Sequence, residues 1–386
     1  MKKKIVILII SIAIVFVFIE MFFSILFLVQ ENLNNWQEDS NVYVFDPLLG
    51  WRGNSNISKY IRNFEKKFKV DSDSFGFREN SNNVLFNNKK IFIFGDSFVW
   101  GVGVDNDKTI SAFLERMTNY EVKNYGMIGY GTDQEYLLLR SINDNSNVII
   151  IMFYINDLRD IDNDNINNPY PCKPKFIVKS DSLFLTNYPV GVKKNNTEIK
   201  NKFVDIRNLG WKYHVSNLLK KMLYKSAIYR IIISYLQYTS FGKWLYKKNL
   251  MEIPEFMTPE WDLANKEQIK YPLIIFDFLV SKIKKESEKR NAQLLFFIIP
   301  HEFQYQKSLK DKMLKLNKLY GYENNIDETM DMVSKILEMK SVKYIYPIKK
   351  FEDEDNKAPL TFRFDKHLNE RGNKLAADLI LKEITE

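Results

Sequence analysis

The chain has 386 residues, of which 45% are hydrophobic, with a formal net charge of +8 and one cysteine. The hydrophobic content excludes a disordered chain, and the length allows about two to three domains. The lone Cys172 excludes an intramolecular disulfide and a zinc site built on cysteines. It lies in the proline-broken loop NPYPCKPK without a nearby histidine, so we do not expect it to be catalytic.

The first element along the chain is an apolar run near the N-terminus. Three lysines (2–4) precede the 25-residue run 5–29, in which 20 residues are Ile, Leu, Val or Phe. Insertion of these side chains into a bilayer contributes about 6–12 kcal/mol, more than the ~3 kcal/mol cost of Glu20. The run is long enough for a transmembrane helix, and no small-residue cleavage site follows it. We therefore expect an uncleaved anchor, with the N-terminus inside and the following chain on the extracytoplasmic side.

The rest of the chain divides by composition. We predict an N-terminal membrane anchor over 1–30, an irregular, polar N-terminal extension over 31–88 and an α/β domain over 89–386. This domain carries an insertion at 158–264, which is too long for an ordinary connection between elements.

Short apolar runs alternate with helical patterns from residue 91 onward. Strands are predicted at 91–95, 121–124, 148–155, 293–300 and 342–348. Helices are predicted at 107–119, 132–142, 265–290, 324–339 and 369–384, the last with Asn369 as its N-cap. This alternation predicts a doubly wound parallel sheet.

The insertion is basic and mainly helical by its sequence pattern. Within 191–250, 13 Lys or Arg residues oppose only Glu198 and Asp205, and the aromatic stretch 211–238 is predicted to be helical. Three interpretations remain open: helices with a solvated face, contact with an anionic membrane surface, or contact with an acidic polymer. Nucleic acid is not expected as a partner.

Four polar clusters follow the predicted strands: GDSF, NYGMIGYGT, YIND and, before the last helix, FDKHLN. In a doubly wound sheet, ligands bind beyond the carboxyl ends of the strands, so these clusters should meet. Ser97 would present its hydroxyl there. A serine becomes a nucleophile when a histidine oriented by a carboxylate takes its proton, and His367 has Asp365 two residues before it.

Attack on an ester carbonyl also requires hydrogen-bond donors for the oxyanion that develops. The candidates are the Ser97 backbone N–H, the side-chain amide of Asn156 and a glycine N–H in the second cluster. Gly126, Gly129 and Gly131 compete for the last role, because a glycine lets the backbone approach a ligand closely.

The order Gly-Asp-Ser, Gly, Asn-Asp and Asp/His resembles the SGNH (GDSL-type) hydrolase superfamily, in its membrane-anchored bacterial form. The resemblance covers 91–384 outside the insertion and implies a flavodoxin-like α/β/α three-layer fold with a parallel sheet. Gly129 lies five residues after Asn124, which matches the family's Asn-x-x-x-x-Gly.

The resemblance also implies the role of each candidate residue. The nucleophile would be Ser97, the oxyanion donors Ser97, Gly129 and Asn156, the general base His367 and its orienting partner Asp365. Many members space the last motif Asp-x-x-His, one residue longer than the Asp-Lys-His found here.

The function implied is that of a serine esterase acting on O-acyl, especially O-acetyl, groups of carbohydrate or cell-surface polymer. Two alternatives remain: an O-acyltransferase that passes the acyl group to a polysaccharide hydroxyl, and a non-catalytic glycan-binding or scaffold protein. No cofactor or metal is expected. The stretch 160–171 begins like a calcium loop but has Asn165 at the glycine position and Pro171 at the glutamate position.

Four further polar residues in or near these clusters have structural interpretations. Asp96 and Asp157 should fix their loops by hydrogen bonding. We expect His214 and His301 to be structural, although His301 follows a predicted strand and could line the pocket.

Overall fold

The structure, a computed structural model, describes positions 4, 11, 14–15 and 17–25 and the ranges 42–63, 65–80, 85–163, 172–191, 226–248, 250–251, 266–321 and 325–385. The chain forms two compact units. The larger unit contains Trp36–Lys194, Pro259–Lys310 and Asn324–Glu386, and the smaller unit contains Met1–Asn35, Asn195–Thr258 and Asp311–Glu323.

The larger unit is built on a five-stranded sheet in the order β11-β10-β7-β5-β6. Its strands are β5 (Lys90–Gly95), β6 (Glu121–Gly126), β7 (Val148–Phe153), β10 (Gln293–Ile298) and β11 (Lys343–Ile345). Every pair is parallel, which confirms the predicted α/β sheet. All six residues of β7 are buried, as expected for a central strand covered on both faces.

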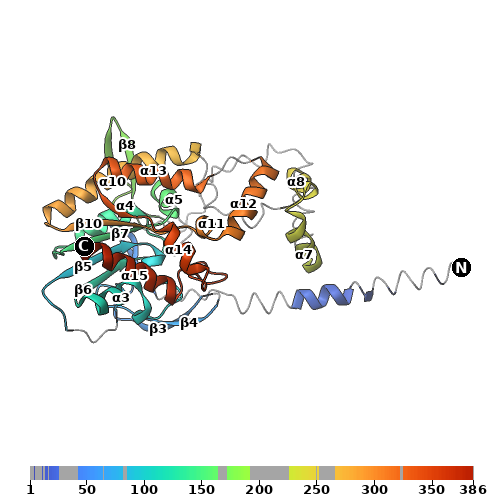
Figure 1. The fold of residues 1–386 in the computed structure, drawn as a ribbon, viewed down its shortest axis with the longest axis horizontal. Coiled ribbons are helices and arrows are strands. Elements are labelled where there is room, and N and C mark those ends of the chain that lie inside the picture. The colour runs from blue at the N-terminus through green and yellow to red at the C-terminus, as the bar shows by residue number, and fades with distance from the viewer. Residues whose placement is uncertain are drawn as a thin grey trace. The chain divides into compact units, whose positions relative to one another are not determined.

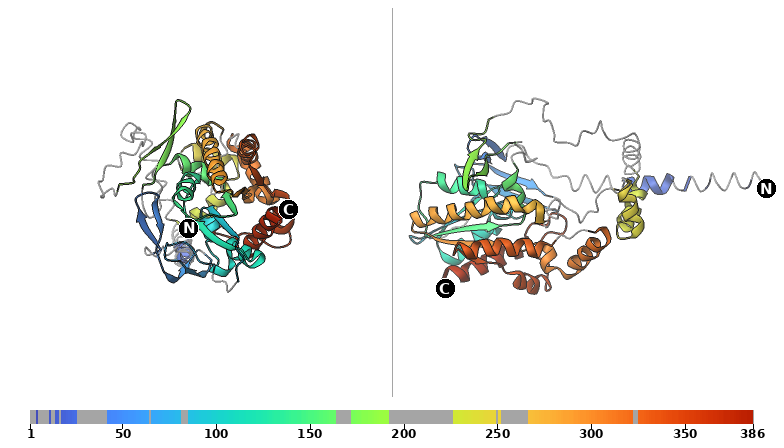
Figure 2. Two further views of the ribbon diagram at one scale, coloured as in Figure 1. Left: turned by 90° about the vertical axis from the view of Figure 1, so that its left-hand side faces the viewer. Right: turned by 90° about the horizontal axis from the view of Figure 1, so that it is seen from above.

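Helices cover both faces of this sheet (Figures 1 and 2). One face carries α3 (Ile110–Thr118) and α15 (Glu370–Thr385), which contact each other. On the other face, α4 (Thr132–Ser141), α5 (Asn156–Asp162) and α13 (Ile326–Met339) contact the long helix α10 (Lys266–Lys289). Further helices are α2 (Ser97–Trp100), η1 (Asn106–Lys108), α11 (Glu302–Tyr305), α12 (Lys307–Tyr320) and α14 (Ile348–Asp355).

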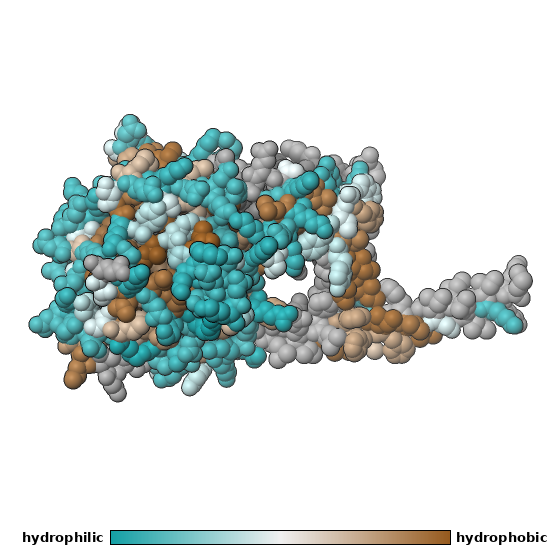
Figure 3. Space-filling view, viewed as in Figure 1, coloured by the Kyte–Doolittle hydropathy of each residue, from teal (hydrophilic) through white to brown (hydrophobic). Residues whose placement is uncertain are grey.

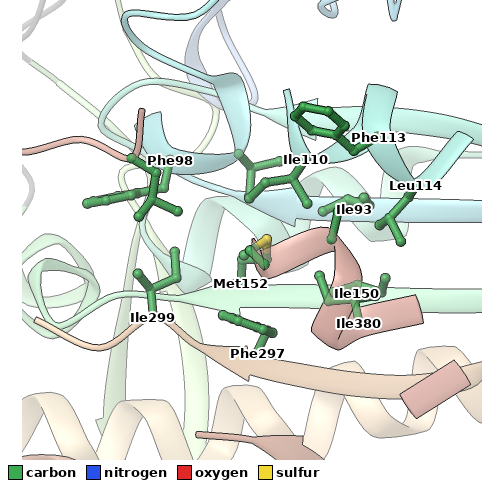
Figure 4. Packing of buried hydrophobic residues seen from close by; sticks show 14 of the residues in the cluster. Ile93, Phe98, Ile110, Phe113, Leu114, Ile150, Met152, Phe297, Ile299 and Ile380 are labelled. Carbon is green, nitrogen blue, oxygen red and sulfur yellow. The ribbon is translucent and has the colours of Figure 1, made fainter. Parts of the chain in front are cut away.

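The core between the sheet and the α3–α15 layer is formed by side chains that are almost wholly buried (Figure 4). It includes Ile93, Ile150, Met152 and Phe297 from strands and Ile110, Leu114 and Ile380 from helices. Burial of each such side chain stabilises the fold by about 1.5–3 kcal/mol. Phe98, directly after the proposed nucleophile, belongs to the same cluster, so the core also holds α2 in place.

Two predicted elements differ in extent. The helix expected over 107–119 is divided, because Thr109 is extended and its hydroxyl accepts a hydrogen bond from Ala112 N–H as the N-cap of α3. The strand expected over 342–348 has only three residues, because Pro347 lacks an N–H and α14 begins immediately after it.

The prediction that 31–88 is irregular is wrong for 43–71, where two hairpins form. β1 (Tyr43–Asp46) pairs with β2 (Gly50–Gly53), and β3 (Ser58–Arg62) pairs with β4 (Lys67–Asp71), both antiparallel. The first turn forms because Asp46 Oδ1 accepts hydrogen bonds from Leu48 N–H at 2.8 Å and Leu49 N–H at 2.9 Å.

The described part of the insertion contains a hairpin besides its helices. It contains an antiparallel hairpin of β8 (Lys175–Lys179) and β9 (Ser182–Thr186). The two turn residues, Ser180 and Asp181, both have positive φ, as the favoured two-residue hairpin turn requires. Helices α7 (Ala227–Leu236) and α8 (Ser240–Lys247) agree with the helical prediction, whereas 192–225 and 252–265 lie outside the described residues.

Among the residues that the structure describes, no helix combines the length and apolar character needed to cross a membrane. The predicted anchor at 5–29 lies partly outside those residues.

Arg78 ties the N-terminal extension to the loop that follows α2. It is 3% exposed, and its guanidinium donates five hydrogen bonds, to Asn106 Oδ1 and to the carbonyls of Trp100, Gly101, Lys69 and Val104. Two of these carbonyls lie at the end of α2. Arg78 therefore fixes the path of the chain as it leaves the candidate site.

We predict that Arg78→Lys lowers the free energy of unfolding by about 2–6 kcal/mol. An ammonium has three donors without the guanidinium fork, so at least two of the five hydrogen bonds are lost, at about 1–3 kcal/mol each. Urea unfolding followed by circular dichroism measures the effect. The control is Arg52→Lys, because Arg52 is half-buried and its hydrogen bonds are 3.2–3.4 Å long. Equal midpoints for the two variants would contradict the prediction.

Candidate active site

Strand β5 ends in a tight turn that places Ser97 at the carboxyl edge of the sheet. A Cβ on Gly95 would lie 2.4 Å from Val99 Cγ2, so only glycine fits before the turn. Asp96 is the N-cap of α2, and its Oδ1 accepts a hydrogen bond from Phe98 N–H at 2.9 Å. Ser97 is therefore the first residue of a short helix and is 9% exposed.

The structure brings Ser97, His367 and Asp365 together, although Ser97 and His367 are 270 positions apart. Ser97 Oγ lies 2.7 Å from His367 Nε2. His367 Nδ1 is hydrogen-bonded to Asp365 Oδ1. The Asp365 side chain is 2% exposed and the His367 side chain 22%. This is the arrangement in which a histidine can take the proton of a serine while a carboxylate fixes its tautomer.

A short loop before α15 holds His367 in this position. Phe362 N–H donates to the His367 carbonyl at 2.9 Å, which closes the loop. Asn369 Oδ1 accepts a hydrogen bond from Gly372 N–H at 3.1 Å, so the predicted N-cap of α15 is confirmed.

The spacing Asp-x-His is sufficient to bring the two side chains together. Lys366 lies between them with a φ of +69°, in the left-handed region, and the chain bends there. Its Nζ lies 3.1 Å from Glu302 Oε2. The backbone bend therefore allows Asp365 to reach His367 across a single intervening residue.

Asn156, the first residue of α5, lies beside the nucleophile. Its side-chain amide donates to Asp96 Oδ2 at 3.1 Å and to Asp160 Oδ2 at 3.3 Å. Both amide protons thus have carboxylate acceptors, and one must exchange before Asn156 can bind an oxyanion. The Ser97 N–H begins a helix and has no acceptor in a preceding turn.

Each of the three competing glycines has a different structural role. A Cβ on Gly126 would lie 2.4 Å from Trp100 N, so Gly126 permits α2 to pack on β6. Gly131 is the N-cap of α4. Gly129 has a φ of +76°, where other residues are strained. Its role as an oxyanion donor stays a prediction.

Aromatic rings extend from the histidine along the site. The His367 ring lies 4.9 Å from Phe98, which lies 4.5 Å from Tyr154, and Tyr154 stacks on His301 at 5.7 Å. His301 is buried, and its Nδ1 accepts a hydrogen bond from Phe303 N–H at 3.2 Å. This contact is the structural role expected for His301.

Within the described ranges, no group of three or more His, Cys, Asp or Glu side chains could hold a metal ion. Cys172 is a buried free thiol. His214 and most of the calcium-like stretch, 164–171, lie outside the described residues.

A group of buried acidic residues lies at the base of the site. The sequence did not predict this group. Each is at most 2% exposed: Asp96, Asp133, Glu135, Asp157 and Asp160. Lys173, a fully buried cation, donates to Asp133 Oδ1 at 2.7 Å, Asp133 Oδ2 at 2.6 Å and the Asp160 carbonyl at 2.6 Å. No pattern in the sequence around Lys173 indicates this role.

Burial shifts the pKa of several of these carboxyl groups. It raises the pKa of Asp96, and it raises that of Asp133 despite the opposing effect of Lys173. Burial and neighbouring carboxylates raise the pKa of Glu135 and of Asp157 well above their ordinary values. Neither Glu135 oxygen has a hydrogen-bond partner in the described structure, which is consistent with a neutral carboxyl.

Asp157 also has the loop contact expected of it. Its Oδ2 accepts a hydrogen bond from the Thr132 hydroxyl at 3.3 Å, joining α5 to the start of α4. Asp96 likewise caps α2, as described above.

A cavity of about 850 Å³ lies elsewhere on the larger unit. Its lining includes Leu48, Phe75, Tyr125, Leu138 and Tyr188 and none of the candidate catalytic residues. The hydrogen bonds among Ser97, His367 and Asp365, rather than cavity size, identify the candidate site.

The chain is similar to solved structures at low sequence identity. No family model and no curated protein match the chain. A member of the lipolytic G-D-S-L family from Veillonella parvula is 12% identical with a TM-score of 0.34, covering 77% of this chain and 99% of its own. An acetylxylan esterase from Geobacillus stearothermophilus is 11% identical with a TM-score of 0.36, covering 78% and 96%. At this level the likeness carries no argument about activity.

We predict that Lys173→Met lowers the free energy of unfolding by about 3–5 kcal/mol, because it leaves the Asp133 carboxylate buried without its cation. Thermal unfolding of the purified variant measures this loss. A second change, Asp133→Asn, should restore part of the stability by removing the unpaired charge. The control is Lys270→Met, whose side chain is 65% exposed in the wild type. A loss no larger than that of the control would contradict the prediction.

We predict that Glu135→Gln becomes more stable than the wild type as pH rises. Below the ordinary pKa of about 4.3, the carboxyl is protonated in both states and the variants differ little. Above it, the unfolded wild type releases the proton that the folded state retains, because the folded pKa is raised. Wild-type stability then falls with increasing pH, by up to about 1.4 kcal/mol per unit, until the folded pKa is reached.

Urea unfolding of both proteins between acidic and neutral pH tests the direction of this change in stability. Glu79→Gln is the matched control, because Glu79 is exposed. A stability difference that is constant with pH, or that favours the wild type at neutral pH, would show that Glu135 is ionised in the folded protein.

Proposed function

We propose that the protein is a serine esterase that removes O-acyl groups, above all acetyl groups, from carbohydrate or a cell-surface polymer. The observation that carries the esterase chemistry is the 2.7 Å contact between Ser97 Oγ and His367 Nε2. The other ring nitrogen, Nδ1, is hydrogen-bonded to Asp365 Oδ1. The carbohydrate substrate is supported by the order of motifs that resembles the SGNH superfamily. A binding protein would have no need of this chain of three hydrogen-bonded side chains.

Acylation begins with Asp365 accepting the Nδ1–H of His367, which leaves the Nε2 lone pair facing Ser97. Ser97 Oγ attacks the ester carbonyl carbon as its proton passes to Nε2. The oxyanion takes hydrogen bonds from the Ser97 N–H and from the Asn156 amide, once the latter exchanges one carboxylate acceptor. The bond to the leaving oxygen then breaks, and His367 protonates the departing alcohol.

Deacylation reverses these roles with water as the nucleophile. Water loses a proton to His367 Nε2 and attacks the acyl-enzyme carbonyl. Collapse of the second tetrahedral intermediate breaks the bond to Ser97 Oγ, which recovers its proton from His367, and the free acid leaves. Every proton passes through one ring nitrogen, so the position of His367 controls both steps.

The predicted anchor would determine where the esterase acts. A helix over 5–29 with lysines before it would hold the esterase on the extracytoplasmic side of a membrane, where surface polymers are found. This part of the proposal rests on the sequence.

We predict that Ser97→Ala and His367→Ala each reduce the release of nitrophenol from p-nitrophenyl acetate by about 10⁴-fold or more. Asp365→Asn should cost a similar factor, because it favours the wrong tautomer of His367. Steady-state kinetics with the full chain in detergent measure these values. Ser58→Ala, a change at an exposed serine, serves as the control.

Two outcomes would contradict the proposal. Release that is indifferent to the Ser97 and His367 changes would exclude a serine acyl-enzyme. Transfer of the acyl group to an added glycan instead of to water, detected by product analysis, would identify an acyltransferase.

A further inference from the structure

Helices α7 and α8 of the smaller unit carry an exposed apolar face (Figure 3). Ile232 is 47% exposed, Tyr235 75%, Phe241 55% and Trp244 48%. The Phe241 and Trp244 rings stack on each other at 5.6 Å. An exposed group of large apolar side chains of this kind marks a surface that contacts a partner.

The opposite side of the same helices is packed, which fixes the orientation of the exposed face. Tyr320 donates its hydroxyl proton to the Gln237 carbonyl at 2.9 Å. The Tyr246 and Tyr320 rings meet edge to face at 5.7 Å, and Ile233 is 7% exposed. These contacts hold Tyr246 and Ile233 inward, so the four exposed residues stay on the surface.

The backbones of α7 and α8 approach each other closely where the chain turns between the two helices. A Cβ on Gly242 would lie 2.0 Å from the Leu236 carbonyl oxygen, so only glycine allows α8 to begin there. Thr239 Oγ1 accepts a hydrogen bond from Gly242 N–H at 3.1 Å as the N-cap of α8. The pair is therefore a defined structural element.

The charge of this element favours an anionic partner. The sequence from 226 to 251 contains Arg230, Lys243, Lys247 and Lys248 and no acidic residue. The four-residue spacing of Lys243 and Lys247 puts them on one side of α8. Aromatic side chains beside lysines are the composition of helices that lie in the membrane interface.

The N-terminal apolar helix contacts α7 through its one charged residue. Residues 17–25 are helical and mostly exposed, but Glu20, Phe23 and Ser24 form a half-buried face. Glu20 Oε2 accepts hydrogen bonds from Ser226 Oγ at 3.0 Å and from Ile228 N–H at 3.1 Å. The start of α7 thus offers donors and the positive end of a helix to a carboxylate that would be costly within a membrane.

We propose that α7 and α8 lie in the interface of an anionic lipid bilayer. Ile232, Tyr235, Phe241 and Trp244 point into the lipid, the lysines meet the head groups, and Glu20 docks α7 onto the N-terminal helix. An acidic polymer would pair with the lysines but would leave the four apolar side chains in water, so the exposed face favours lipid. This inference does not depend on the esterase chemistry.

The test uses the full chain in vesicles of phosphatidylcholine and phosphatidylglycerol. In a Cys172→Ser background, single cysteines replace Tyr235 or Phe241 and carry an environment-sensitive fluorophore. The matched control is a label at Phe75, which is 71% exposed in the larger unit. We expect doxyl-labelled lipid to quench the labels at 235 and 241 at least severalfold more than the label at 75, and aqueous iodide to show the reverse order.

Each other outcome of the labelling overturns the proposal. Labels at 235 and 241 that iodide quenches as strongly as the label at 75 would mean a solvated face. Labels protected from both quenchers would mean that protein, such as a second copy of the chain, covers the face. Retained p-nitrophenyl acetate hydrolysis, or retained far-ultraviolet circular dichroism if the wild type is inactive, shows that each labelled variant is folded.

A separate variant tests the role of Glu20. Amide hydrogen exchange at Ile228 should increase about tenfold or more in Glu20→Leu, because the acceptor is lost, and less in Glu20→Gln, which retains an acceptor oxygen. Equal exchange in the wild type and Glu20→Leu would show that Glu20 does not hold the start of α7.

Discussion

The double pairing of β5 is the constraint on which the candidate site depends. This strand is hydrogen-bonded to β6 on one side and to β7 on the other, so its end lies well inside the carboxyl edge of the sheet. Asp96 follows β5 and Asn156 follows β7, and their side chains meet at 3.1 Å although they are 60 positions apart. A nucleophile at the end of an edge strand would lack one of these neighbours.

The sequence was sufficient to predict the sheet because its strands are buried. The run 148–153 is wholly apolar, as in a parallel sheet with two covered faces, and 91–95 is nearly so. The same reasoning places Ser97 at the carboxyl edge of the sheet. His367 follows α14 rather than a strand, so it was predicted from its motif before the last helix, and the loop that brings it to Ser97 could not be predicted from the strand pattern.

The N-terminal hairpins could not be predicted in this way. The strand β3, with the sequence SKYIR, has one buried residue, so its pattern is indistinguishable from an irregular segment. These hairpins are held by contacts far along the chain. Trp51 Nε1 donates to the Ile128 carbonyl at 3.0 Å, and Asp105 Oδ1 accepts from Lys69 N–H at 2.7 Å. Such contacts leave no local pattern in the sequence.

The buried acidic residues are a second feature that only the three-dimensional structure reveals. Glu135 lies in the first turn of α4 and Asp157 in that of α5, where acidic residues usually face water and favour the helix start. Here both are fully buried, and Lys173, from the insertion, pairs with the neighbouring Asp133 rather than with either of them. The region around Ser97 is therefore less stable at neutral pH than an apolar packing would be, a cost that is common near functional sites.

The left-handed backbone of Lys366 has a consequence for how this protein's sequence can vary. Glycine and asparagine adopt a φ of +69° readily, whereas valine, isoleucine and proline do not. Among orthologues, position 366 should therefore vary in charge but remain free of β-branched residues and proline. The lysine's contact with Glu302 could be lost in evolution without moving the histidine, while a change in backbone shape there could not.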